Sequence, residues 1–318
     1  MDHGGNVQQQ GGRAPAGLRT SPSGRVPQWV LDEADGRAPA VEQWRSWTPA
    51  PPPRQRRRRN WTGLGTAVLV VAVVSLGVVA DHHGLLPGAR PAASADMPTP
   101  GVDAADDPLG TPPLAPVGAG AYDFLAVQDD GVTPVAYDPC RPVHYVVRPD
   151  NAPFGADQLV PDAVARVSAV TGLQFVYDGS TDEAPSQPRD LFQPDRYGDR
   201  WAPLLITWDE VSENADLAAD VAGLGGSTPV GRAGGPLVYV TGSVALDAAQ
   251  FTDILAQPGG ADVARAIVLH ELGHAVGLGH VSDPTQLMYP EASSVFDFAA
   301  GDLEGLARLG AGACEPGL

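Results

Sequence analysis

The sequence predicts an α+β domain over residues 121–318, in which a mixed sheet carries helices. Short apolar runs of strand length alternate there with longer segments whose apolar residues recur at helical spacing. Almost 200 residues are enough to bury an ample core. No internal repeat is visible along the chain of 318 residues, which argues for one domain rather than a repeat array.

The first half of this domain is predicted to run strand, helix, strand. RPVHYVVRPD (141–150) and LQFVYDG (173–179) contain apolar runs typical of strands. Residues 156–172 between them have helical periodicity and end at Gly172, a frequent helix stop. Parallel pairing of the two strands through this helix predicts a right-handed crossover. Residues 179–200 are polar and are predicted to form a long loop.

The second half contains three further strand candidates and two helices. PLLITWDE (203–210) and VAGLGGS (221–227) are predicted as strands, and 237–247 as a pair of strands split by a turn at Thr241-Gly242. ADVARAIVLHELGHAVGL (261–278) predicts a long helix and GDLEGLARLG (301–310) a short closing one. His144, on the first strand, is interpreted as a packed core residue rather than a ligand.

The residues before the domain divide by charge. Residues 1–60 carry a net charge of +5, residues 61–80 carry no charge, and residues 81–318 carry −23. We therefore expect a disordered basic cytoplasmic tail (1–60), one transmembrane helix (61–80), a Pro/Ala-rich linker (81–120) and the folded domain (121–318). The arginines before the apolar segment predict a single-pass protein of the cell membrane, with a cytoplasmic N-terminus and an extracytoplasmic domain.

Two other interpretations of the apolar segment stay open. A cleaved signal peptide is one, because Ala93-Ser94-Ala95 has the small-x-small form of a cleavage site. A buried core helix is the other, although such helices rarely run this long without charge. The negative charge of the C-terminal part gives no sign of nucleic-acid binding.

HELGHAVGLGH (270–280) places three of the seven histidines within eleven residues. Residues four apart are neighbours on a helix, so His270 and His274 are expected to bind one metal ion from the same face. Gly277 would end the helix and turn the chain, which would bring His280 back as the third ligand. Three imidazoles leave one position open on zinc, as in catalytic sites. Glu271 would then act as the general base on a zinc-bound water.

The pattern HExxHxxGxxH, followed by Met288 in QLMYP, resembles the matrixin-like metzincins, which are zinc metallopeptidases. The resemblance implies a twisted five-stranded mixed sheet with about three helices and one catalytic zinc. It also implies an apolar floor under the metal from Met288 and a brace on that turn from Asp302. Where matrixins commonly have a first aspartate before this one, the chain has Gly301. The implied partner is a protein or peptide substrate, bound along the edge strand of the sheet.

The sequence leaves two alternatives to this function open. The first is a catalytically silent, zinc-stabilised surface binding module, against which Glu271 argues, because a structural zinc site needs no base. The second makes the outer domain a sensor for the cytoplasmic tail. An acidic run offers candidate calcium ligands, although such a run is more often a solvated face; its residues are Asp209, Glu210, Glu213, Asp216 and Asp220.

The two cysteines, Cys140 and Cys314, are expected to form a disulfide. An oxidising extracytoplasmic compartment favours the bond, and an even count leaves no thiol over. The competing hypothesis makes Cys140 a thiolate that keeps the zinc latent. YDPCRPVHY runs directly into a predicted strand, however, and does not lie in a removable segment.

Overall fold

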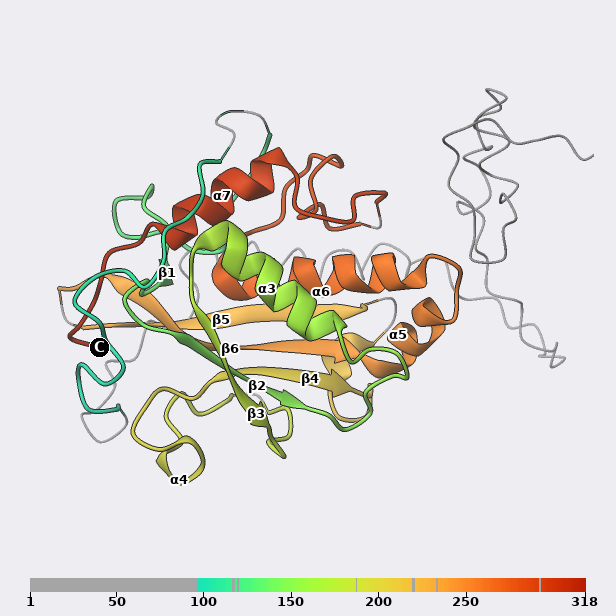
Figure 1. Cartoon of the computed structure of the whole chain (residues 1–318), viewed down its shortest axis with the longest axis horizontal. Helices are drawn as coiled ribbons and strands as arrows, with labels where there is room; N and C mark the ends of the chain where they lie inside the picture. The colour runs from blue at the N-terminus through green and yellow to red at the C-terminus, as the bar shows by residue number, and fades with distance from the viewer. Residues whose placement is uncertain are drawn as a thin grey trace, which may run out of the picture. The chain divides into compact units, whose positions relative to one another are not determined.

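The computed structural model describes residues 97–318, except 116–117, 119, 187, 219–220, 233 and 292. The predicted cytoplasmic tail, the apolar segment 61–80 and the first part of the predicted linker lie outside these residues. The described part of the chain forms one sheet with helices packed against it (Figure 1).

Six strands form the sheet within the described residues. They are β1 (Ala136–Tyr137), β2 (Val143–Arg148), β3 (Phe175–Ser180), β4 (Leu204–Asp209), β5 (Gly223–Gly231) and β6 (Leu237–Asp247). Their order is β1-β6-β4-β2-β3, and β5 also pairs with β6. The β1–β6, β6–β4, β4–β2 and β2–β3 pairs are parallel, and the β5–β6 pair is antiparallel.

The expectation of five strands is therefore corrected to six. The additional strand, β1, is only two residues long, and it pairs with β6 at Val238 and Tyr239. A run this short has no period-2 pattern to detect in the sequence. β1 and β4 pair with different parts of one edge of β6, and β5 pairs along the other edge. Among the described residues, no strand pairs with the outer edge of β5.

The described helices include three longer ones, as expected, and two shorter ones that the sequence analysis missed. The longer ones are α3 (Leu159–Thr171), α6 (Gly260–Val276) and α7 (Ala300–Gly310), and the shorter ones are α4 (Pro194–Tyr197) and α5 (Ala248–Leu255). A 3₁₀ turn spans Ala215–Leu217. Helix α5 begins directly after β6, where the Asp247 side chain caps it by accepting the N–H of Gln250 at 2.8 Å.

The core lies between the sheet and the pair formed by α3 and α6, which lie side by side in Figure 1. Val167 of α3 and Leu269 and Leu272 of α6 are completely buried, as are Val244 and Leu246 of β6. Burying an aliphatic side chain contributes about 1.5–3 kcal/mol. This packing fixes α6, and with it the histidines that α6 carries, against the sheet.

Strand β6 is continuous, which corrects the predicted turn at Thr241-Gly242. Gly242 lies in register with Ser227 of β5. A Cβ on Gly242 would lie 2.3 Å from both the carbonyl oxygen of Gly226 and the Oγ of Ser227. Glycine therefore allows the close approach of β5 here and does not mark a chain reversal.

The predicted transmembrane helix before the domain is also corrected. No helix in the described part of the chain is long and apolar enough to cross a membrane. The longest one, α6, has 17 residues and carries His270, Glu271 and His274, whereas a span needs about 20 predominantly apolar residues. The segment 61–80, for which the helix was predicted, lies outside the described residues.

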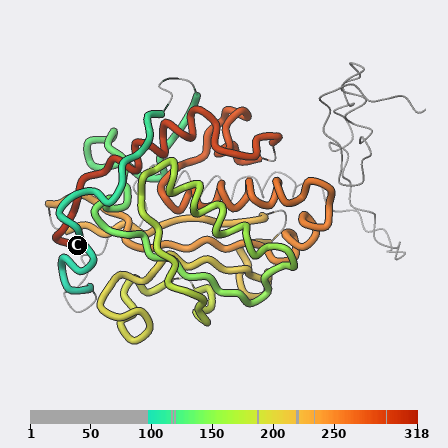
Figure 2. The backbone as a smooth tube through the Cα atoms, viewed as in Figure 1, coloured from blue at the N-terminus to red at the C-terminus, as the bar shows by residue number. Residues whose placement is uncertain are grey.

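The predicted disulfide is confirmed. Cys140 and Cys314 are joined, with their Cα atoms 5.4 Å apart, within the usual range for such a bond. Residues of the predicted linker pack beside it, since the N–H of Ala105 donates to the carbonyl of Cys140 at 2.8 Å. Figure 2 shows this early segment and the C-terminal segment at the same end of the domain. The side chain of Arg141 joins them by donating to the carbonyls of Val102 and Leu318.

The loop between β3 and β4 is held by a buried ion pair. Arg189 donates to both carboxylate oxygens of Glu183, at 2.7 and 2.8 Å, and each side chain is 8% exposed. Arg189 also donates to the Oγ1 of Thr241 on β6 at 2.8 Å, and Tyr197 of α4 donates to Glu183 at 2.6 Å. The predicted polar loop is thus fastened to the sheet by its charged residues.

Candidate metal centre

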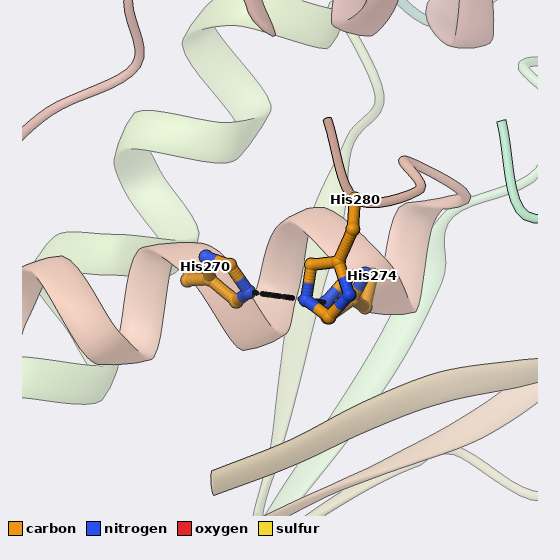
Figure 3. A group of neighbouring side chains, drawn as sticks. All are labelled: His270, His274 and His280. Carbon is orange, nitrogen blue, oxygen red and sulfur yellow. Dashed lines mark hydrogen bonds between the residues drawn. The ribbon is translucent and has the colours of Figure 1, made fainter. Parts of the chain in front are cut away.

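Helix α6 places three of the predicted residues on its last turns. His270 and His274 are one turn apart, and Glu271 follows His270 directly. The helix ends at Gly277, whose φ of 118° lies in the left-handed region that favours glycine. A side chain there would also collide, because a Cβ would lie 2.9 Å from Leu309. The turn that follows brings His280 back beside the helix (Figure 3).

The three imidazole rings face one another through their Nε2 atoms (Figure 3). The Nε2 of His270 lies 3.1 Å from that of His274 and 3.1 Å from that of His280, and the remaining pair is 3.0 Å apart. His274 is buried, His270 is partly buried and His280 is exposed. One side of the trio is therefore open to solvent.

Backbone carbonyls fix the protonation of two of these rings. The Nδ1 of His270 lies 2.8 Å from the carbonyl oxygen of Leu287, and the Nδ1 of His274 lies 2.7 Å from that of Leu278. A carbonyl only accepts, so each Nδ1 carries the proton and each Nε2 presents a lone pair. Burial lowers the pKa of His270 to about 4 and that of His274 to about 3, and it also lowers the pKa of His280. The rings are neutral at pH 7.

This arrangement fits a zinc ion. Two lone pairs 3.1 Å apart repel each other, and a cation between them removes that repulsion. Tetrahedral zinc with bonds of 2.0–2.1 Å requires nitrogen atoms about 3.3 Å apart, close to the separations observed here. A carbonyl that orients the ring through Nδ1 is also the usual outer partner of a histidine ligand. The donor set and its support thus match the group that the sequence pattern implies.

Glu271 lies against strand β5, next to the histidine trio. Its side chain is buried, and burial raises its pKa to about 8. A cation held by the neighbouring imidazoles would favour the ionised carboxylate and oppose this shift. A buried carboxylate one residue from a candidate metal ligand is a group that could exchange a proton with a metal-bound water.

Met288 and Asp302 hold the backbone around the three histidines in place. Met288 is 1% exposed, and its Sδ would lie 2.8 Å from a Cβ on Gly273, the residue before His274. Asp302 is fully buried, and its carboxylate accepts the N–H groups of Leu287 at 2.7 Å, Met288 at 3.3 Å and Ala299 at 2.9 Å. Burial raises the pKa of Asp302, and these three N–H groups oppose the shift. Asp302 therefore holds the backbone segment whose Leu287 carbonyl orients His270.

Gln286 is a supporting residue that sequence reasoning missed. It is 3% exposed, and its Oε1 accepts the N–H of Gly301 at 2.8 Å, at the start of α7. Gly301 stands where matrixins commonly have aspartate. A Cβ there would lie 2.1 Å from the carbonyl oxygen of Ala121. The glycine thus leaves room for the incoming chain, which packs directly on α7.

Other residues that the sequence analysis considered do not join the trio. His144 lies on β2 and interacts with Asp178 at 2.9 Å and with Arg200. Within the described residues, two groups bring three or more potential ligand atoms together: the histidine trio, and Asp138 with the disulfide cysteines. The acidic run beginning at Asp209 forms no such group there, and Asp220 lies outside the described residues.

A comparison with protein families supports the resemblance found in the sequence. The matrixin family profile matches residues 200–309, from just before β4 to the last turn of α7. This range contains the histidine trio, Glu271, Met288 and Asp302. The resemblance to matrixin-like metzincins is confirmed over these residues, and it suggests a zinc metallopeptidase.

Two solved structures match part of the chain at low identity. Archaemetzincin (amzA) from Methanopyrus kandleri is 19% identical; the match covers 52% of this chain and 93% of that one, with a TM-score of 0.36. The GM1-bound form of the ECX AB5 holotoxin is 10% identical, with 54% of this chain and 81% of that one covered and a TM-score of 0.33. No curated protein matches the chain.

Proposed function

Because residues 200–309 match the matrixin family, we propose that the chain is a zinc-dependent endopeptidase that uses Glu271 as its base. One observation carries the proposal: three imidazoles converge through Nε2 atoms 3.0–3.1 Å apart, and the residue after the first of them, Glu271, is buried. A structural zinc site is usually closed by four protein ligands and has no need of a base. Three ligands and an adjacent carboxylate are the composition of a hydrolytic site.

In the proposed reaction, the three histidines bind the metal and Glu271 transfers the proton. His270, His274 and His280 would hold the zinc, which when bound polarises the scissile carbonyl and lowers the pKa of the attacking water toward 7. The carboxylate of Glu271 takes a proton from this water as the water attacks the carbonyl carbon. It then passes the proton to the amide nitrogen, which leaves as an amine. One carboxylate thus serves as base and then as acid.

Strand β5 offers a way to bind the substrate. It pairs with β6 on one side only, and Glu271 packs against it at Gly223 and Gly225. An extended peptide added to the unpaired edge would gain main-chain hydrogen bonds and lie beside the base. Such binding recognises the main chain of the peptide, which all sequences share. It therefore suits the hydrolysis of peptide bonds in segments of varied sequence.

Replacement of the base tests the proposal. The purified full chain, loaded with zinc, is incubated with a peptide library, and its products are identified by mass spectrometry. We expect Glu271→Gln to lower the cleavage rate at least about 10³-fold, because water activation and leaving-group protonation both pass through this carboxylate. The zinc content should not change. Glu210→Gln, a surface variant outside the site, is the control and should cleave at the wild-type rate.

The outcomes separate the alternatives. Retained cleavage in Glu271→Gln would show that another group is the base. A wild-type chain that binds one zinc but cleaves nothing would instead favour the zinc-stabilised binding module.

We also propose that the domain works outside the cytoplasm. The Cys140–Cys314 disulfide supports this, because such bonds persist in oxidising compartments. In intact cells that produce the full chain, an impermeant protease added outside should digest the domain. Protection of the domain, together with two free thiols, would contradict the proposal.

A further inference from the structure

Strand β5 approaches α6 very closely at two glycines. A Cβ on Gly223 would lie 2.7 Å from the Cγ of Glu271 and 3.0 Å from its Cδ and Oε1. A Cβ on Gly225 would lie 2.1 Å from the backbone carbonyl oxygen of Glu271 and 2.8 Å from its carbonyl carbon. Real Cβ atoms essentially never approach other heavy atoms within 3.0 Å. The side chain and the backbone of Glu271 therefore occupy space that any larger residue at these positions would take.

Neighbouring residues of β5 show that this contact belongs to one face of the strand. Successive strand residues point to opposite faces, so Gly223, Gly225 and Ser227 share the face toward α6. The Oγ of Ser227 donates to the carbonyl of Ala275 in α6 at 2.6 Å. Gly226, on the other face, has no atom within 4 Å of its would-be Cβ.

Backbone conformation does not explain these glycines. Neither Gly223 nor Gly225 is among the glycines with positive φ, so another residue could adopt the same backbone angles. Gly223 begins β5 and Gly225 lies inside it, and glycine in a strand lowers stability because it loses the most conformational freedom on folding. The space that Glu271 occupies therefore explains why both residues are glycine. Gly223 makes room for the side chain of Glu271, and Gly225 makes room for its backbone carbonyl.

We propose that Gly223 is a positioning residue for the catalytic base: its missing side chain gives the Glu271 carboxylate its place between α6 and the edge strand. The inference rests on the proposed function of Glu271. Gly225 has a different role, because it meets backbone atoms and sets how closely α6 lies on β5. A methyl group at 223 displaces a flexible side chain, whereas one at 225 must move a helix.

Two glycine-to-alanine variants of the full chain distinguish these roles. We expect Gly223→Ala to lower kcat about 10–100-fold, because a displacement of about 1 Å at a reacting group has effects of this size. Its KM should stay within about threefold of wild type, and its zinc content and Tm should not change. Gly225→Ala should lower the Tm. The control is Gly235→Ala, in the β5–β6 connection, where the nearest atom to a Cβ is an unstrained 3.6 Å away; it should leave all of these quantities unchanged.

A double-mutant cycle shows whether the effect passes through Glu271. In a Glu271→Ala background the Cγ and the carboxylate that a Cβ at residue 223 would meet are both absent, so that the remaining slow cleavage no longer depends on their position. Gly223→Ala should then lower kcat by less than about threefold. An equal loss in both backgrounds would overturn the proposal, as would a Gly223→Ala enzyme with wild-type kcat.

A readout without catalysis separates this proposal from the proposed function. A crystal structure of Gly223→Ala should show the Glu271 carboxylate moved from its wild-type position, with the three histidines unchanged. That result would support the positioning role even if the wild-type chain cleaved no peptide. An unmoved carboxylate in an active enzyme would overturn the positioning role alone.

Discussion

Removal of the Asp302 carboxylate should cost more stability than most single substitutions. Asp302 is fully buried and accepts three backbone N–H groups, at 2.7, 2.9 and 3.3 Å. Asp302→Ala leaves these donors without a partner, and each buried unsatisfied donor costs about 1–3 kcal/mol. We expect a loss of about 3–6 kcal/mol in the free energy of unfolding, which corresponds to a Tm lower by roughly 10–20 °C. Asp302→Asn keeps one carbonyl oxygen and should lose about half as much.

The same substitution should weaken zinc binding. Asp302 holds Leu287, whose carbonyl orients the ring of His270, and loss of such an outer partner typically costs 10–100-fold in metal affinity. Denaturant unfolding of the metal-free chain and competition with a zinc chelator measure the two effects separately. Asp130→Ala is the matched control, because that exposed carboxylate accepts hydrogen bonds from Val132 and Thr133 of its own turn; it should change neither quantity. An Asp302→Ala chain within 1 kcal/mol of wild type, or with unchanged zinc affinity, would refute the bracing role.

Three further predictions concern the frame around the site. The Cys140–Cys314 bond closes a loop of 174 residues, so replacing both cysteines by serine should lower stability by about 5 kcal/mol in denaturant unfolding; an unchanged midpoint would contradict this. Burial raises the pKa of Glu183, but the hydrogen bonds that Glu183 accepts from Arg189, Gln193 and Tyr197 together lower it below the ordinary value. Its contribution to stability should therefore be complete above the unfolded value of about 4.3 and disappear as the pH falls through the lower folded value. Glu183→Gln should remove this fall in the free energy of unfolding at low pH and cost about 3–5 kcal/mol at neutral pH. If the free energies of the variant and the wild type fell in parallel with pH, the ion pair would not be the cause. Finally, Asp297 accepts from Arg166 at 2.8 Å and lies 3.5 Å from Arg265; Asp297→Asn should increase hydrogen exchange in the loop after Met288, and unchanged exchange would show that these pairs do not hold it.

The spacing of the histidines was predictable because the relation between them is local. His270 and His274 are one helical turn apart, and Gly277 has the positive φ that the turn toward His280 needs. The succession of β2, α3, β3 and β4 also followed from periodicity, since each of these elements carries its own apolar pattern. Local sequence patterns failed to predict the role of a residue where that role depends on a contact with a segment distant in the sequence.

Two glycines illustrate that failure. Gly242 looks like a turn residue in the sequence, yet it lies inside β6 because β5 passes too closely for a side chain. Gly223 belongs to a predicted strand with nothing in its sequence to single it out, yet its contact is with Glu271, 48 residues later. The five-strand expectation failed for a related reason, because β1 is a strand only through its pairing with β6. Contacts between distant segments leave no periodic signal.

The measurement that tests the metal centre most directly is the zinc content and zinc coordination of the full chain. Metal analysis should find one zinc per chain, and X-ray absorption should show three imidazole nitrogens at about 2.0–2.1 Å and no sulfur. His274→Ala should reduce the zinc content sharply, whereas His144→Ala, which changes a histidine bound to Asp178 instead, should keep it. A chain that binds no zinc, or one whose zinc content is unaffected by His274→Ala, would contradict the account.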